Sequence, residues 1–208
     1  MNNWREWRKQ QRADLIARRK QIPEAERALW SEAITASLIQ GFPVLQQRRV
    51  GCYSPFQGEY EPAQVMVYLY ACGATLALPE VMGPHQPLRF RKWWPQAPMR
   101  KDAYGIAIPH DTEEVIIDAI IIPMVAFDSQ GYRLGYGSGF FDRTLAAINP
   151  RPLTIGVAFE ILHLPTIYPH EHDIAMDYVI TEKTIYYLTD HTLQSISRET
   201  CAIRNTLK

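Results

Sequence analysis

The stretch that most constrains the fold is an apolar segment followed by a glycine-rich loop, residues 120–143. Residues 119–122 contain no polar side chain, which is typical of a central strand in a parallel sheet that is covered on both faces. Pro123 has no amide hydrogen to donate, so we expect the strand to end there. A turn signal follows at residues 128–131. Three glycines then occur at alternate positions: Gly135, Gly137 and Gly139.

A helix is predicted from about Phe140, so the order of elements is strand, glycine loop and helix N-terminus. Backbone N–H groups in such a loop can converge on phosphate oxygens, and the helix dipole favours negative charge at this end. The loop is not a P-loop, because no Gly-Lys-Ser/Thr follows, and it is not the dinucleotide GxGxxG motif. A purely structural turn is the alternative. Polar residues around the loop favour phosphate binding, with Arg133 as a bidentate donor: Asp128, Arg133, Asp142 and Arg143.

The segment FDSQGYRLGYGSGFFDR, residues 127–143, resembles the signature of the 5-formyltetrahydrofolate cyclo-ligase (5,10-methenyltetrahydrofolate synthetase) family. The usual form of that signature reads roughly FDxxGxRLGYGGGYYDR. Ser138 stands here in place of a Gly or Lys, and Phe140 and Phe141 replace a tyrosine pair, which removes two hydroxyl groups. Arg133, the flanking glycines and Asp142 match the signature.

The resemblance implies ATP- and magnesium-dependent conversion of 5-formyltetrahydrofolate to 5,10-methenyltetrahydrofolate, with release of ADP and phosphate. It also implies the sugar-phosphate isomerase/CoA-transferase-like architecture. The alternation of strands and helices along the chain independently favours a single three-layer α/β/α domain over residues 1–208. The resemblance covers about residues 5–183 and leaves residues 184–208 as a C-terminal tail; a weak helical pattern is predicted over residues 182–208.

Individual roles follow from matching positions to the family. ATP and phosphate binding is implied for the first helix and the glycine loop: Arg8, Lys9, Arg12, Arg133, Leu134, Gly135, Tyr136, Gly137, Ser138, Gly139, Phe140 and Phe141. Substrate binding is implied for Glu59, Tyr136, Gly137, Ser138, Gly139 and Phe140. Magnesium is implied at Asp142 and Asp173, since carboxylates together with nucleotide oxygens are its usual ligands.

The first predicted helix, residues 4–21, is strongly basic. Arg5, Arg8 or Lys9, and Arg12 share one stripe, because residues three, four and seven apart are neighbours on a helix. A solvated basic face is the structural alternative. The family has a KxxxR pattern here that contacts nucleotide and folate. Counted back from the IPEAER segment, its positions fall on Arg8 and Arg12, with Lys9 beside the position where the family has lysine.

Further helices are predicted at residues 23–39 and 62–72, and further strands at residues 49–53, 74–79, 152–159 and 178–181. Glu59 and Glu61 follow the first of these strands, where open α/β sheets bind ligands. We expect Glu61 to complement the next helix N-terminus. Glu59 matches the family's substrate glutamate, and its carboxylate suits the paired N–H donors of a pterin.

Two other segments have alternative interpretations. Residues 89–95 alternate basic and aromatic side chains, which indicates a rim strand lining a pterin or adenine pocket rather than a base-stacking surface for nucleic acid. Residues 104–109 resemble a structural or pocket-forming segment of the family. The spacing of His170, His172 and Asp173 would suit a transition metal, but no third distant ligand cluster supports a dedicated zinc site.

Composition excludes several classes of function. Lys and Arg number 22 and Asp and Glu 22, so no global positive field indicates nucleic-acid binding. No apolar run approaches the roughly 20 residues that span a bilayer, and the N-terminal segment lacks the apolar region of a secretory signal. Three scattered cysteines, with one necessarily unpaired, favour a reducing compartment. We therefore expect a cytoplasmic monomer whose partners are a reduced folate and ATP, not membranes or nucleic acid.

Two other functions remain open. A sugar-phosphate isomerase-like enzyme would use the same anion site without ATP. A non-catalytic folate- or RNA-binding relative would be expected to lose the acidic metal positions or Arg133, which are present here. The expected reaction requires no nucleophilic Ser/His or Cys/His arrangement, and none is predicted.

Overall fold

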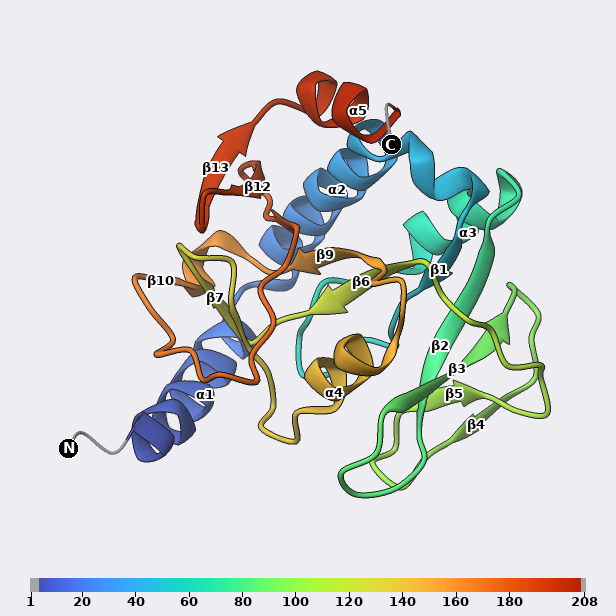
Figure 1. The fold of residues 1–208 in the computed structure, drawn as a ribbon, viewed down its shortest axis with the longest axis horizontal. Coiled ribbons are helices and arrows are strands. Elements are labelled where there is room, and N and C mark those ends of the chain that lie inside the picture. Colours follow the sequence, from blue (N-terminus) through green and yellow to red (C-terminus); the bar gives the residue numbers. More distant parts are fainter. Residues whose placement is uncertain (1–3, 207–208) are drawn as a thin grey trace.

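An eight-stranded mixed sheet forms the centre of the computed structural model, which describes residues 4–206 (Figure 1). Its spatial order is β13-β12-β11-β9-β6-β1-β2-β3. The bounds are β1 Arg49–Gly51, β2 Thr75–Val81, β3 Leu88–Trp93, β6 Ala119–Pro123, β9 Leu153–Val157, β11 Tyr178–Ile180, β12 Ile185–Thr189 and β13 Thr192–Ile196. The strands from β11 to β2 pair in parallel, whereas β3, β12 and β13 join antiparallel.

Strand β6 is the central parallel strand that the apolar run predicts. It pairs with β1 on one side, where Ile120 lies opposite Gly51, and with β9 on the other, where Ile121 lies opposite Ile155. Residues 119–122 are fully buried, and the strand ends at Pro123 as expected. The chain passes from β1 to β2 on one side of the β1–β6 pair and from β6 to β9 on the other, so the connections leaving β1 and β6 diverge, and this is the kind of switch point at which open α/β sheets bind ligands.

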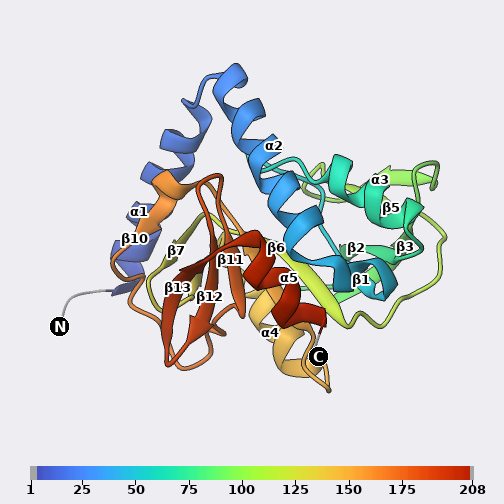
Figure 2. The same cartoon turned by 90° about the horizontal axis from the view of Figure 1, so that it is seen from above.

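The two faces of the sheet are covered unequally. The helices are α1 Trp4–Lys20, α2 Glu24–Gly41, α3 Ala63–Ala71, α4 Phe140–Ala147 and α5 Arg198–Thr206. Ile121 lies in the apolar cluster beneath α2, α3 and α5, whereas Ile120 and Ile122 lie in the cluster beneath α4. In Figure 2, α2 and α3 lie above the sheet and α4 below it. The predicted three-layer arrangement is therefore present, with one thin layer.

A small sheet links helix α1 to the glycine loop. Strands β7 (Ala126–Asp128) and β8 (Arg133–Leu134) form a hairpin, and β10 (His163–Leu164) pairs with β7. The predicted turn lies between β7 and β8, where buried Asp128 accepts N–H bonds from Gln130 at 3.0 Å and Tyr132 at 3.1 Å. Helix α1 runs beside this sheet in both views (Figures 1 and 2). The glycine loop leaves β8 and enters α4 at Phe140, as predicted.

The weak helical pattern predicted for residues 182–208 is wrong over its first part. Strands β12 and β13 extend the sheet there, and only α5 is helical. Asp190 and His191 join the two strands, both with positive φ (48° and 59°), which is what a tight two-residue hairpin turn requires. A second hairpin, β4 (Met99–Lys101) with β5 (Ala107–Pro109), was also not predicted as such. Among residues 4–206, no helix is long and apolar enough to cross a bilayer.

Candidate active site

A cavity of about 380 Å³ lies at the carboxyl ends of β1, β2 and β6. Its wall combines α1, the loop after β1, the turn of the β4–β5 hairpin, the glycine loop and the segment before β11. Five segments that are distant in sequence therefore meet at the switch point. The sequence predicts this position for the loops after β1 and β6, and it gives residues 104–109 as structural or pocket-forming without predicting the hairpin that carries Tyr104 and Ile106 into the wall.

The glycine loop requires its glycines where the backbone turns. Gly137 has φ of 106°, and Gly139, at the N-cap of α4, has φ of 65°. L-residues with side chains rarely adopt these values. A Cβ at Gly137 would lie 3.4 Å from the guanidinium carbon of Arg12, and the Nε of Arg12 donates to the Gly135 carbonyl at 2.7 Å. Arg12 is thus packed on the loop itself.

Arg133 is the most enclosed cation in the cavity wall. Its side chain is 4% exposed, and its Nη2 lies 2.7 Å from Oδ2 of Asp142. Its Nη1 is buried and has no hydrogen-bond partner among residues 4–206. Burial lowers the pKa of the Arg133 guanidinium, and the Asp142 carboxylate opposes that shift. A buried donor without a partner, beside a glycine loop, is suited to receive an anion.

A second arginine–carboxylate pair, Arg8 with Asp173, also lines the cavity. Arg8 is ion-paired with Asp173, and it also donates to the carbonyls of Ile167 and Tyr168, each at 3.0 Å. Burial, and then the nearby charge of Arg8, lowers the pKa of Arg12. Like charges brought together in this way favour a ligand that carries several negative charges.

Both carboxylates implied as magnesium ligands line the cavity, and each is held by an arginine. Asp142 pairs with Arg133 and also accepts the Ile174 N–H at 3.2 Å, while Asp173 pairs with Arg8 and accepts the His170 N–H at 2.6 Å. Carboxylate oxygens next to a phosphate site are the donor set that Mg²⁺ prefers, so the residues present fit this ion. The ion would have to share or replace the arginine contacts.

Glu59 also lines the cavity, and its side chain is nearly fully buried. Its Oε2 accepts the Phe56 N–H at 2.9 Å, and its Oε1 accepts the Tyr136 hydroxyl at 2.9 Å. Burial raises the pKa of Glu59, whereas Arg19, the Phe56 N–H and Tyr136 oppose the rise. The expectation for Glu61 is met, because it accepts the Ala63 N–H at the start of α3 at 3.2 Å.

Nearly all residues expected at the site are brought together, with one exception. Lys9 is exposed and does not line the cavity, whereas Arg8 and Arg12, on the other side of α1, do. The remaining expected residues line it: Glu59, Arg133, Leu134, Gly135, Tyr136, Gly137, Ser138, Gly139, Phe140, Phe141, Asp142 and Asp173. Sequence reasoning missed Tyr53, which lines the cavity, and Arg19, which donates to the hydroxyl of the cavity residue Tyr136, whereas Tyr104 lies in the segment expected to be structural or pocket-forming.

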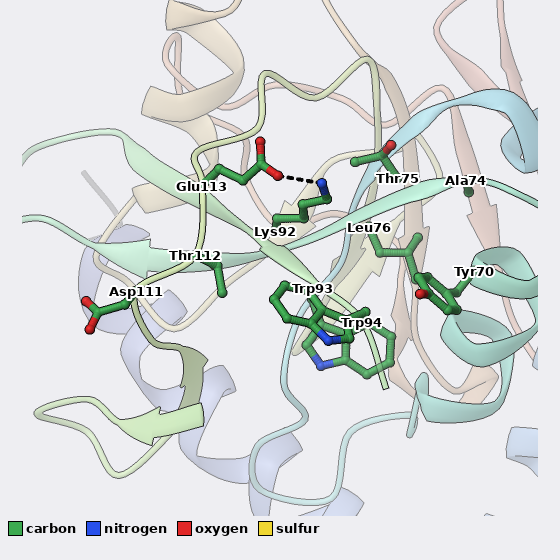
Figure 3. Close-up of a pocket in the computed structure, with 10 residues that line it drawn as sticks. All are labelled: Tyr70, Ala74, Thr75, Leu76, Lys92, Trp93, Trp94, Asp111, Thr112 and Glu113. Carbon is green, nitrogen blue, oxygen red and sulfur yellow. Dashed lines mark hydrogen bonds and ion pairs between the residues drawn. The ribbon is translucent and has the colours of Figure 1, made fainter. Parts of the chain in front are cut away.

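The prediction that residues 89–95 line the ligand pocket is wrong, because none of them lines this cavity. Of β3, only Leu88 lines the cavity, and Arg91 is directed to Glu80 at 2.9 Å. Trp93 and Trp94 instead line a larger cavity of about 600 Å³ at the amino end of β2 (Figure 3). None of residues 127–143, which carry the family signature, borders that cavity. We therefore do not take it as the candidate site despite its greater volume.

Two further clusters lie outside the cavity. Ser129 Oγ lies 3.3 Å from Nε2 of His163, whose Nδ1 lies 3.3 Å from Glu160, so a Ser/His arrangement is present although none was predicted. Burial would raise the pKa of Glu160, but hydrogen bonds from His163, Thr181 and Tyr186 lower it to about 2. These bonds tie β10 to β11 and β12, which is a structural role.

The second cluster is formed by His170, Glu171 and His172, whose potential metal-ligand atoms lie within 4.8 Å of one another.

Comparisons with known proteins agree with this geometry. The model of the 5-formyltetrahydrofolate cyclo-ligase family matches residues 4–182. The 5-formyltetrahydrofolate cyclo-ligase of Mycolicibacterium smegmatis is 32% identical over 183 residues, covering 84% of this chain and 93% of the relative. That of Escherichia coli is 29% identical over 177 residues, covering 81% and 96%. The NMR structure of Aquifex aeolicus 5,10-methenyltetrahydrofolate synthetase matches with a TM-score of 0.77 at 29% identity, covering 91% of this chain and 96% of its own.

Proposed function

The chain belongs to the 5-formyltetrahydrofolate cyclo-ligase family, and we propose that its cavity converts 5-formyltetrahydrofolate to 5,10-methenyltetrahydrofolate with ATP and Mg²⁺. The observation that carries this proposal is the buried, unpartnered Nη1 of Arg133 beside the glycine loop. It marks a place for a phosphate in the same cavity that the Glu59 carboxylate lines.

The reaction explains why the cavity needs both a place for a phosphate and the Glu59 carboxylate. A formamide oxygen is a poor leaving group, so the formyl carbon does not condense with nitrogen 10 unaided. Transfer of the γ-phosphoryl group from ATP to that oxygen releases ADP and makes the carbon electrophilic. Nitrogen 10 then attacks the carbon and loses its proton, and phosphate departs with the former formyl oxygen. Such a transfer depends mainly on positioning and on neutralising charge.

The residues of the chain divide these tasks. The glycine-loop N–H groups together with Arg133, Arg8 and Arg12 hold the triphosphate and stabilise charge on the transferred group. Glu59 accepts the exocyclic amine and the adjacent ring N–H of the pterin, which orients the formyl group. Asp142 and Asp173 would hold Mg²⁺, which supplies charge neutralisation at the phosphate oxygens. The two phenylalanines at residues 140 and 141 provide an apolar wall in place of tyrosine hydroxyls.

The test mixes the purified protein with 5-formyltetrahydrofolate, ATP and Mg²⁺ and follows the near-ultraviolet absorbance of the methenyl product. We expect product only when both ATP and metal are present, with ATP-free and EDTA-treated samples as controls. Product without ATP would contradict the phosphorylation step. Binding of folate by calorimetry without any product would point to a non-catalytic relative.

A further inference from the structure

Arg19 is a buried arginine that no part of the proposed reaction uses. It extends from the last turn of α1 and is 1% exposed. Its Nε donates to the Gln57 carbonyl at 3.1 Å and its Nη1 donates to the Met124 carbonyl at 3.1 Å. Gln57 follows β1 and Met124 follows β6, so one guanidinium joins α1 to both loops that leave the switch point.

The remaining nitrogen of Arg19 lies next to Tyr136 and Glu59, two of the residues proposed to bind the folate. Its Nη2 donates to the Tyr136 hydroxyl at 2.6 Å and lies 3.9 Å from Oε1 of Glu59. The Tyr136 hydroxyl in turn donates to the same Glu59 oxygen at 2.9 Å. Arg19, Tyr136 and Glu59 therefore form a chain in which the arginine supplies the positive end.

Among the groups around Glu59, Arg19 is the one whose charge favours the ionised carboxylate. The neighbouring ionisable groups are Tyr53 from the end of β1, Tyr136 from the glycine loop and Arg19 from α1. Of these groups, drawn from residues 4–206, Arg19 is the cation. Glu59 is nearly fully buried, and burial alone disfavours the carboxylate.

We propose that Arg19 is a positioning residue that keeps Glu59 ionised and directed into the cavity, so that Glu59 can accept the paired N–H donors of the pterin. This inference rests on the proposed function, because it assumes that Glu59 binds the folate. A protonated Glu59 would present a hydroxyl hydrogen to one of those N–H groups and lose part of the contact.

A merely structural role for Arg19 would make a different prediction. If it only ties the two loops together, any substitution would weaken folate binding to the same extent at every pH. If it sets the charge of Glu59, then removing the cation raises the pKa of Glu59. Folate binding would then be impaired at low pH and recover as the pH rises and the carboxylate re-forms.

The experiment measures 5-formyltetrahydrofolate binding by calorimetry from about pH 6 to about pH 9, with KM and kcat from the product assay alongside. At the acid end of this range we expect Arg19→Gln to weaken folate binding roughly tenfold to a hundredfold, because one hydrogen bond to a charged group is lost. At the alkaline end its affinity should approach that of wild type. The effect should fall on KM more than on kcat. Arg19→Lys, which keeps the charge, should restore most of the wild-type pH profile.

Two further variants complete the design. Arg18→Gln removes an exposed arginine from the neighbouring position of α1, and its binding should match wild type at every pH. Glu59→Gln should bind folate weakly without pH dependence, and adding Arg19→Gln to it should cost little more. Circular dichroism confirms that each variant is folded before it is assayed.

The outcomes separate the two proposals. An Arg19→Gln deficit that is the same at every pH, or equal profiles for the Gln and Lys variants, would overturn the role of Arg19 while leaving the reaction intact. A wild-type protein that neither binds the folate nor forms product would overturn the proposed function itself.

Discussion

Replacing Asp142 by asparagine removes the charge that balances Arg133 while changing the side-chain shape very little. The Arg133 side chain is 4% exposed, so in the variant its guanidinium stays buried without a carboxylate. Breaking a buried ion pair costs about 3–5 kcal/mol, because one charge is left uncompensated. Since the Asp142 side chain is 20% exposed, solvent screens part of this, and we expect a loss of about 2–3 kcal/mol.

That loss corresponds to a fall in Tm of about 5–10 °C for a chain of this size, measured by differential scanning calorimetry. An anion that binds Arg133 supplies the missing charge, so inorganic phosphate should raise the Tm of Asp142→Asn by more degrees than it raises that of wild type. Asp118→Asn is the matched control. Asp118 pairs with Arg49 at 3.0 Å, and their side chains are 32% and 51% exposed, so its loss should cost under about 1 kcal/mol and be independent of phosphate.

Two results would refute this reasoning. Equal Tm losses in the two variants would show that the burial of Arg133 does not make its pair special. The same phosphate-induced shift in wild type and in Asp142→Asn would show that the anion does not bind at Arg133.

Four further outcomes are expected. Asp142→Asn should lose metal-dependent turnover by a larger factor than folate affinity, and unchanged turnover would contradict the magnesium assignment. Arg133→Ala should raise KM for ATP more than KM for folate, as measured by initial rates with each substrate varied. Gly137→Ala should lower activity at least about tenfold with little change in fold, because its φ of 106° disfavours a side chain although a Cβ there would meet Arg12 at ordinary contact distance; kinetics and circular dichroism together test this. Glu160, whose pKa is lowered from 4.5 to about 2, stabilises the fold above about pH 4.5, and this contribution is lost as the pH falls towards 2, so acid titration of Glu160→Gln should show a flatter stability profile in that window.

Local patterns were enough to predict much of the fold. The unbroken apolar run of residues 119–122 indicated a central strand because no polar residue marks a solvent face, and β6 is fully buried there. The glycines at positions 135–139 indicated the loop that enters α4, because side chains disfavour the backbone conformations adopted there. The hairpin of β12 and β13 was missed because its alternation is short and its turn residues, Asp190 and His191, are not glycine.

The site was less predictable where it depends on tertiary burial. Of the predicted stripe of α1, Arg8 and Arg12 line the cavity, but Lys9 lies outside it because its side chain projects into solvent from the next position of the helix. Arg19 stands in a run of three basic residues, and nothing local distinguishes it from Arg18, which is exposed. The carbonyls that accept hydrogen bonds from Arg19 come together only where the loops after β1 and β6 meet in the folded chain.

The thin layer over the sheet has a consequence for how the protein loses activity. Within residues 4–206, α4 is the helix that covers the cluster containing Ile120, Ile122 and Leu145, and its N-cap is Gly139 of the glycine loop. Opening of this eight-residue segment would therefore solvate part of the core and dismantle the phosphate loop in a single sub-global step. On warming or in mild denaturant, ligand binding should disappear before the sheet melts. Slowed hydrogen exchange at the amides of α4 would then report that nucleotide has bound.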